Sequence, residues 1–372
     1  MIKDIIFEPL KFRHLTVKNR IFRSNTYGNL DSPDGFGTPA RLKWEEKFAR
    51  GGVGAILSGA VPVHSQGRIA PNCASLESDE TIPFWRQVSA TVRPYDCKYI
   101  VQLSYGGKQL AGASRELTPA QLQEIASYFA AAARRAREAG LDGIEVDATP
   151  SGTGRLLDDL TEENAADPPN LIAKFLSPRT NNRTDDYGGS WHNQARFLLE
   201  TLGAIRLEVG ADFHLQVKIG AIDNLADEIQ LCQWVEAAGA DALHVGRKIP
   251  YLDNPATEFP LDIAGAHVDN AKQLKQSVTI PILCTGGFQT ASYIRQVLTQ
   301  GCCDAVTLAR ALIANNDLVH QFAQGKDSPD KPCSYCEKCR LNLAENPLGC
   351  YDVSRYDGDY IKMSQEIMSV YL

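Results

Sequence analysis

The segment REAGLDGIEVD, from Arg137 to Asp147, decides how the chain folds. An Ala-rich amphipathic stretch ends at Gly140, a common helix stop, and an apolar run with the length of a buried strand follows at once. The same junction occurs three more times, in Ala49–Gly59 (ARGGVGAILSG), Glu236–Gly246 (EAAGADALHVG) and Leu298–Leu308 (LTQGCCDAVTL). Repeated helix-to-strand junctions predict a parallel sheet covered by helices.

Eight strands are expected in total, because four further apolar runs occur elsewhere in the chain: Arg20–Ser24, Lys98–Leu103, His214–Ile219 and Thr279–Cys284. Eight β-α units favour an α/β fold of the (β/α)8 class, a TIM barrel, over an open sheet. The regular spacing of the β-α units is interrupted by two long segments, Ser151–Pro169 and Ile249–Ala266. Both are expected at the carboxyl face of the barrel, where active sites are built. Residues 1–325 are assigned to the barrel and residues 326–372 to a short cysteine-rich tail packed on it.

Composition narrows the classes of function. The chain has 372 residues, 44% hydrophobic and 22% charged, as in ordinary folded proteins. The net charge of -7 provides no basic field for nucleic acid. No stretch approaches the roughly 20 apolar residues of a membrane helix, and the first residues are too short and too charged for a signal peptide. We therefore expect a cytoplasmic protein that binds neither nucleic acid nor membrane.

A phosphate site is predicted where the last two strands end. The seventh strand runs into Gly286 and Gly287, and the eighth ends at Ala309 and Arg310 before a new helical pattern. Glycines let backbone N–H groups approach an anion, the helix adds its positive end, and an arginine adds a charge-assisted contact. The alternative is that the glycines serve tight turns and Arg310 a surface ion pair.

Two polar residues stand inside apolar strands. Lys218 lies in LQVKIG and Gln102 in IVQLS. A cation among apolar neighbours needs a partner or a cavity. At the ends of barrel strands, an amide and a cation can bind the carbonyl and nitrogen edge of a planar heterocycle. Taken singly, each is equally explained as a satisfied polar group of the core.

Several motifs resemble the old yellow enzyme family of FMN-dependent NADH:flavin oxidoreductases over nearly the whole chain. The most specific is FLSPRTNNRTDDYGGS, from Phe175 to Ser190. The others are PLKFRHLTVKNRI (Pro9–Ile21), GGVGAILSGAVPVHSQGR (Gly51–Arg68), VQLSYGGKQ (Val101–Gln109) and LARALIANNDL (Leu308–Leu318).

The resemblance implies a non-covalent FMN at the mouth of the barrel, with hydride passing from NADH or NADPH to the flavin and on to an acceptor. It places Ser24, Asn25 and Thr26 along the flavin. Ala60 and Gln102 would bond the pyrimidine edge, and Lys218 would stabilise negative charge on the reduced ring. The phosphate-binding positions that it implies are those of the anion site above: Gly286, Gly287, Ala309 and Arg310.

The sequence departs from the family after the fourth strand. The family usually carries H-x-x-N or H-x-x-H there, followed by a proton-donating tyrosine, whereas this chain has Asp147 and Pro150. An ionised aspartate would repel a developing enolate. We name three catalytic candidates: Tyr27 as proton donor or structural tyrosine, Tyr105 at a position often held by histidine, and Asp147 as an acid or a ligand for a cationic substrate.

The tail carries a metal-ligand pattern, C-x-x-C-x-x-C followed by one more cysteine: Cys333, Cys336, Cys339 and Cys350. Four thiolates suit structural zinc and a [4Fe-4S] cluster equally well. A similar cluster follows the barrel in the dienoyl-CoA reductase and trimethylamine dehydrogenase branch of the family, and this resemblance favours iron and sulfur. The other six cysteines are expected to be buried small residues.

The sequence supports four hypotheses of function. The leading one is an FMN-dependent oxidoreductase, an ene-reductase that uses NADH or NADPH to reduce an activated C=C bond of a small organic substrate. The second is an FMN and iron-sulfur dehydrogenase or demethylase that passes electrons to an electron-transfer protein. The third is a phosphate-binding barrel lyase or isomerase without flavin, and the fourth is a non-catalytic flavoprotein with a zinc-stapled tail.

Overall fold

The computed structural model describes residues 4–106, 116–149, 170–220, 224–246, 263–343 and 345–372. Pro150, the segment 151–169 and residues 249–262 of the second expected insertion lie outside the described residues.

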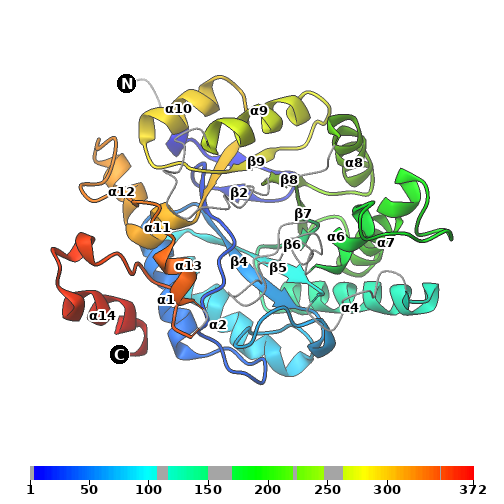
Figure 1. Cartoon of the computed structure of the whole chain (residues 1–372), viewed down its shortest axis with the longest axis horizontal. Helices are drawn as coiled ribbons and strands as arrows, with labels where there is room; N and C mark the ends of the chain where they lie inside the picture. The colour runs from blue at the N-terminus through cyan, green and yellow to red at the C-terminus, as the bar shows by residue number, and fades with distance from the viewer. Residues whose placement is uncertain (1–3, 107–115, 150–169, 221–223, 247–262, 344) are drawn as a thin grey trace.

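Eight parallel strands form a closed barrel in the order β10-β3-β4-β5-β6-β7-β8-β9 (Figure 1). Closure is made by β10, which pairs with β9 on one side and with β3 on the other. All eight expected strands are present, and the predicted (β/α)8 fold is confirmed. Their bounds are β3 Ile21–Arg23, β4 Ala55–Pro62, β5 Lys98–Ser104, β6 Gly143–Asp147, β7 His214–Ile219, β8 Ala242–Val245, β9 Ile282–Thr285 and β10 Ala305–Leu308.

Helices surround the barrel (Figure 1), and α1, α2, α4 and α9 among them contact the strands directly. The start of the long helix α4 is fixed by a capping box made by Thr118 and Gln121. The helices of the barrel are α1 Pro39–Arg50, α2 Ile82–Val92, α4 Pro119–Glu138, α6 Leu171–Leu176, α7 Trp191–Val209, α8 Leu225–Ala237, α9 Ile263–Lys275, α10 Ala291–Thr299, α11 Arg310–Ala314 and α12 Leu318–Ala323. Short 3-10 turns occur at Ile5–Phe7, Ser65–Gly67, Asp79–Thr81 and Arg93–Tyr95.

A small hairpin closes the amino end of the barrel. Its strands, β1 Leu10–Lys11 and β2 Thr16–Val17, pair antiparallel. Leu10, Phe12, Leu15 and Val17 pack in one apolar cluster with inward side chains of the barrel strands, including Phe22, Leu57, Ile100, Ala242, Leu283 and Ala305. Apolar side chains thus fill the amino end of the barrel, so a polar ligand would bind at the carboxyl end.

Side chains alternate along each strand between the barrel interior and the helices. One step above the apolar cluster, the interior is lined by polar residues that contact one another: Gln102, Glu145, Gln216, His244, Thr285 and Thr307. The next inward residues, Asp147 on β6 and Lys218 on β7, are paired neighbours at the carboxyl mouth. The barrel therefore changes from apolar to charged along its axis.

The tail lies against the side of the barrel that carries α1 and α11 (Figure 1). It contains α13 Lys338–Asn342, α14 Tyr360–Met368 and the turns Val353–Tyr356 and Ser369–Tyr371. Gln289 exchanges two hydrogen bonds with the backbone of Cys333, of 2.8 and 3.1 Å, and Lys47 donates to Ser369 Oγ over 2.8 Å. Within the described part of the chain, no helix combines the length and the apolar character needed to cross a membrane.

Candidate active site

The carboxyl mouth of the barrel holds a cation that is fixed by an amide. Lys218 Nζ donates to Asn25 Oδ1 over 3.0 Å, and Asn25 Nδ2 donates to Ser58 O over 3.0 Å. Ser24, Asn25 and Thr26 follow β3 directly and are buried, as expected for residues that line a ligand site. Ala60 lies in β4 opposite Gln102 of β5, just after a register shift in the strand pairing. The structure therefore brings the predicted flavin-edge residues to one end of one barrel.

The centre of this arrangement is Glu145, which the sequence analysis did not single out. Its carboxylate is completely buried and accepts hydrogen bonds from Asn25 Nδ2, Gln102 Nε2 and His244 Nδ1, each over 2.9 Å. A fourth donor is Gln216 Nε2. Glu145 thus fixes the orientation of the two amides, Asn25 and Gln102, that face the mouth.

Charge and burial compete at this carboxylate. Burial alone would raise the pKa of Glu145, but His244, Lys218 and the Gln216 amide outweigh it and lower the pKa to about 2. Burial lowers the pKa of His244, and the adjacent Glu145 carboxylate opposes that change. His244 Nε2 also lies 2.6 Å from Thr285 Oγ1 and 3.1 Å from Thr307 Oγ1, so both ring nitrogens have partners.

The predicted anion site is shaped by glycines. Gly286 has φ +135° and Gly287 has φ +57°, conformations that side chains rarely adopt. A Cβ at Gly286 would lie 2.3 Å from His267 Nδ1, so the loop after β9 has room only for glycine at that position. Ala309 precedes α11, and Arg310 is the first residue of that helix.

The tail contacts this anion site. The Arg310 guanidinium forms an ion pair with Glu337 and lies 4.6 Å from the centre of the Tyr335 ring. Tyr335 OH donates to the carbonyl oxygen of Gly287 over 3.0 Å. The cysteine-bearing segment is therefore packed on the loop and the arginine that the sequence assigns to phosphate.

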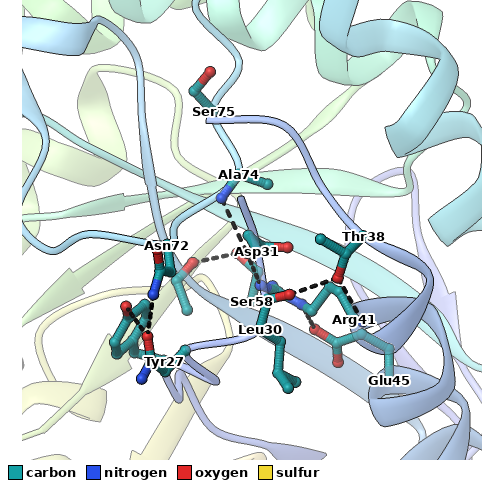
Figure 2. A network of polar contacts seen from close by, with 12 residues as sticks. Tyr27, Leu30, Asp31, Thr38, Arg41, Glu45, Ser58, Asn72, Ala74 and Ser75 are labelled. Atoms are coloured by element: carbon teal, nitrogen blue, oxygen red, sulfur yellow. Dashed lines mark hydrogen bonds and ion pairs between the residues drawn. The ribbon is translucent and has the colours of Figure 1, made fainter. Parts of the chain in front are cut away.

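Buried ion pairs hold the segment after β3 (Figure 2). Arg23 pairs with Glu45 of α1 and donates to Thr26 Oγ1, and both charged side chains are fully buried. Arg41 bridges Glu45 (2.7 Å) and Asp31 (2.8 Å). Because breaking a buried pair leaves an unpaired charge in the protein interior, this network fixes the backbone that carries residues 24–31.

The three catalytic candidates lie in different surroundings. Tyr27 OH donates toward Asn29 Oδ1 (2.9 Å) and Pro71 O, and burial raises the pKa of Tyr27 well above its usual range. The ring of Tyr105 lies against Gly67, and burial, with the Glu124 carboxylate, raises the pKa of Tyr105. Of the three, Asp147 is the one placed beside Lys218. The catalytic roles of all three stay predictions.

Asp147 is buried at the end of β6, and its Oδ1 accepts from Thr149 N (3.0 Å) and Thr149 Oγ1 (2.6 Å). Burial raises the pKa of Asp147, and the nearby Lys218 partly offsets that rise. Asn170 donates its side-chain N–H to Asp147 O over 2.6 Å, and its Oδ1 caps α6. Thr149 and Asn170 therefore both hydrogen-bond to Asp147.

The four tail cysteines line one pocket together with Arg310, Glu337 and Tyr351. Among the residues that the structure describes, no three His, Cys, Asp or Glu side chains are arranged as ligands of one metal ion. The six remaining cysteines are buried and form no disulfide, as expected for small buried residues. The metal at Cys333, Cys336, Cys339 and Cys350 remains a prediction.

A closed barrel with a cation and oriented amides at its mouth, beside a glycine-rich loop, defines a TIM-barrel protein whose mouth has the chemistry to suit a phosphorylated planar ligand. The chain belongs to the NADH:flavin oxidoreductase / NADH oxidase family, whose profile matches residues 5–115 and 168–328. The predicted family is confirmed, and with it FMN and a reduced nicotinamide dinucleotide as the molecules that the family uses. The alternative of a barrel lyase or isomerase without flavin is set aside.

Relatives of two lengths resemble this chain. A metal reductase from Desulforamulus reducens is 28% identical over 376 residues, which cover 93% of this chain and 53% of that protein. The NADPH dehydrogenase of Bacillus velezensis is 28% identical over 344 residues, or 86% of this chain and 94% of the relative. A solved 2-naphthoyl-CoA reductase, 22% identical, superposes with a TM-score of 0.80 over 96% of this chain and 58% of that one, which supports the fold. The chain thus spans about half the length of the first relative.

The site fits FMN by its chemistry. Gly286 and Gly287 both have positive φ, a backbone conformation that allows neighbouring N–H groups to turn toward an anion such as a phosphate. Lys218, Asn25 and Gln102 supply a positive charge and fixed amides of the kind that bind a flavin's polar edge. The sequence signal that found Lys218 and Gln102, a polar residue inside an apolar strand, would also have found Glu145, Gln216 and His244.

Proposed function

We propose that this protein is an FMN-dependent oxidoreductase that takes hydride from NADH or NADPH and reduces an activated C=C bond of a small organic substrate. The observation that carries the proposal is the Lys218–Asn25–Glu145–Gln102 group, held at the same barrel mouth as the Gly286 loop. Family membership supports the flavin and the nicotinamide, and the NADPH dehydrogenase from Bacillus velezensis supports the donor.

Bound FMN would supply the hydride-accepting and hydride-donating chemistry. Lys218 would supply a positive charge that stabilises the electron-rich reduced ring, and its hydrogen bond to Asn25 keeps the ammonium at the mouth. Because Gln102 Nε2 is bonded to Glu145, the orientation of the amide is fixed, and its oxygen serves as the acceptor for a ligand N–H. The backbone at Gly286, Gly287 and Ala309, with Arg310, would hold the phosphate.

Asp147 and Tyr27 are the candidate proton donors. Asp147, whose raised pKa keeps more of it protonated near neutral pH than an exposed aspartate, lies beside Lys218 at the mouth. We assign Asp147 as the acid or the substrate-binding group. Tyr27 is kept as the alternative donor, although its raised pKa makes it a weak acid.

A second candidate is a dehydrogenase or demethylase that passes electrons from FMN through a [4Fe-4S] cluster to a partner protein. It is supported by the four cysteines around one pocket, whose wall includes Arg310, and by a buried acid that suits a cationic amine. Thiolates from Cys333, Cys336, Cys339 and Cys350 would hold the cluster, or structural zinc in the alternative.

The first experiment is an absorption spectrum of protein purified without oxygen, with iron, sulfide and zinc assayed on the same sample. Bleaching of bound flavin by NADH or NADPH, followed by reoxidation with an enone, supports the leading proposal. Flavin with about four irons per chain, bleached by an amine and not by a nicotinamide, favours the second candidate. Absence of flavin binding by the purified protein and by apoprotein mixed with FMN overturns both.

A further inference from the structure

Asn29 lies in the loop after β3. Its side-chain amide hydrogen-bonds to three parts of the chain: Tyr27 in the same loop, Asn72, and the tail. Its Oδ1 accepts from Tyr27 OH over 2.9 Å and from Asn72 Nδ2 over 2.8 Å. Its Nδ2 donates to two backbone oxygens of the tail, Leu343 O over 3.2 Å and Asn346 O over 3.1 Å. Both ends of the amide are therefore used, one toward the barrel mouth and the other toward the tail.

The segment on the barrel side is a small rigid unit, shown in Figure 2. Asp31 N donates to Asn72 O over 3.3 Å, and Asp31 Oδ2 accepts from Ala74 N over 2.9 Å. Tyr27 OH also reaches Pro71 O. The loop of residues 71–74 is therefore bonded to residues 27–31, and a change at Asn29 acts on both.

The segment on the tail side, residues 343–348, lies between two of the predicted metal ligands, Cys339 and Cys350. Leu348 N donates to Gly28 O over 2.9 Å, next to the Asn29 contacts, and Leu348 is buried. The carbonyl oxygens of Leu343 and Asn346 are therefore the tail acceptors of the Asn29 side chain.

The backbone favours asparagine at this junction. Asn29 has φ +53° and Asn72 has φ +52°, in the left-handed region that asparagine tolerates better than most residues. Aspartate tolerates the same conformation and keeps the oxygen acceptor, but it has no side-chain N–H for the tail carbonyls. The two functions of the amide can therefore be separated by one substitution.

We propose that Asn29 is a positioning residue that couples the tail to the barrel mouth, so that ordering of the tail at Leu343, Asn346 and Leu348 also orders Tyr27 and the 71–74 loop. Coupling of this kind is reciprocal: loosening either side loosens the other. It goes beyond the proposed function, because it holds whether or not the tail carries a metal and whatever the substrate.

The test is amide hydrogen exchange on the full-length protein, comparing wild type with Asn29→Asp. Loss of two neutral hydrogen bonds is expected to raise exchange at Leu348, and through the coupling at Asp31 and Ala74, on the order of tenfold. Exchange in β6 reports global opening and should not change. Asn224→Asp, at the N-cap of α8, is the matched control, because aspartate also caps a helix.

A second variant perturbs the other side. Asn72→Gly keeps the left-handed backbone but removes the donor to Asn29, and it should raise exchange at the distant Leu348 amide. The double variant should then add less than the product of the single effects. If Asn29→Asp raises exchange at Leu348 while Asp31 and Ala74 keep wild-type rates, or if Asn72→Gly leaves Leu348 unchanged, the coupling does not exist.

Discussion

Replacing Glu145 by glutamine removes the charge at the centre of the polar layer and leaves the shape of the side chain almost unchanged. The glutamate accepts from four side chains, Asn25, Gln102, Gln216 and His244. A glutamine amide offers one oxygen and turns its own N–H groups toward some of those donors, so at least one buried donor loses its acceptor. Each such loss costs about 1–3 kcal/mol. Because one or two of the four donors lose their acceptor, we expect Glu145→Gln to lower the unfolding free energy by about 2–4 kcal/mol.

The same contacts also make the stability depend on pH. The pKa of Glu145 is lowered from its usual 4.5 to about 2 in the folded protein. Its ionised form therefore contributes stability that is complete above about pH 4.5 and is lost as pH falls toward about pH 2. A pKa difference of about 2.5 corresponds to about 3 kcal/mol, in the range expected from the hydrogen bonds.

The assay is urea unfolding of flavin-free protein, followed by tryptophan fluorescence between about pH 3 and pH 7. Wild type should lose stability more steeply than Glu145→Gln as pH falls below about 4.5. The control is Glu46→Gln, a half-buried carboxylate with one hydrogen bond, from Tyr95, for which we expect a loss below about 1 kcal/mol. A loss at Glu145→Gln no larger than that of the control, with parallel pH curves, would refute the reasoning.

Four further predictions concern the ligand sites. Lys218→Met removes the charge at the mouth and should weaken FMN binding to apoprotein by about tenfold or more, measured by quenching of flavin fluorescence. Gly286→Ala should weaken FMN binding, because the added Cβ would clash with His267 and displace the loop. The control is Gly325→Ala, which is also at positive φ but has open space around it and should leave FMN affinity unchanged. Equal FMN affinities of the two variants would count against a role of the Gly286 loop in binding. Tyr27→Phe should leave flavin reduction by NADH or NADPH unchanged in stopped-flow traces, and a loss confined to the oxidative half-reaction would restore Tyr27 as the proton donor. Cys339→Ser should reduce the metal content of the purified protein, and an iron and zinc content equal to wild type would exclude Cys339 as a ligand.

Much of the architecture could be predicted because it depends on local pattern. The four glycine junctions and the apolar runs located all eight barrel strands, since strands buried on both faces must be continuously apolar. A polar residue inside such a run then marked Lys218 and Gln102. The hairpin at Leu10–Val17 was not predicted, because strands of two residues have no periodicity to detect.

The contacts between distant segments were beyond the reach of pattern. Nothing in the spacing of Asn25, Gln102 and His244 indicates that all three contact the Glu145 carboxylate, because this depends on the register of a closed barrel. The pairing of Arg310 with Glu337 is equally invisible, since it depends on how the tail folds back.

The sequence by itself determined the strands, the family motifs, the cysteine spacing and the residue types at the mouth, because each of these is written in neighbouring residues. The tertiary structure decided which of these residues act together. It assembled the Glu145 network, placed Asp147 beside Lys218 and set Asn29 between Tyr27 and the tail. The physical reason is that hydrogen bonds and ion pairs act over a few ångströms in space, and only barrel closure and packing of the tail bring residues more than a hundred positions apart within that range.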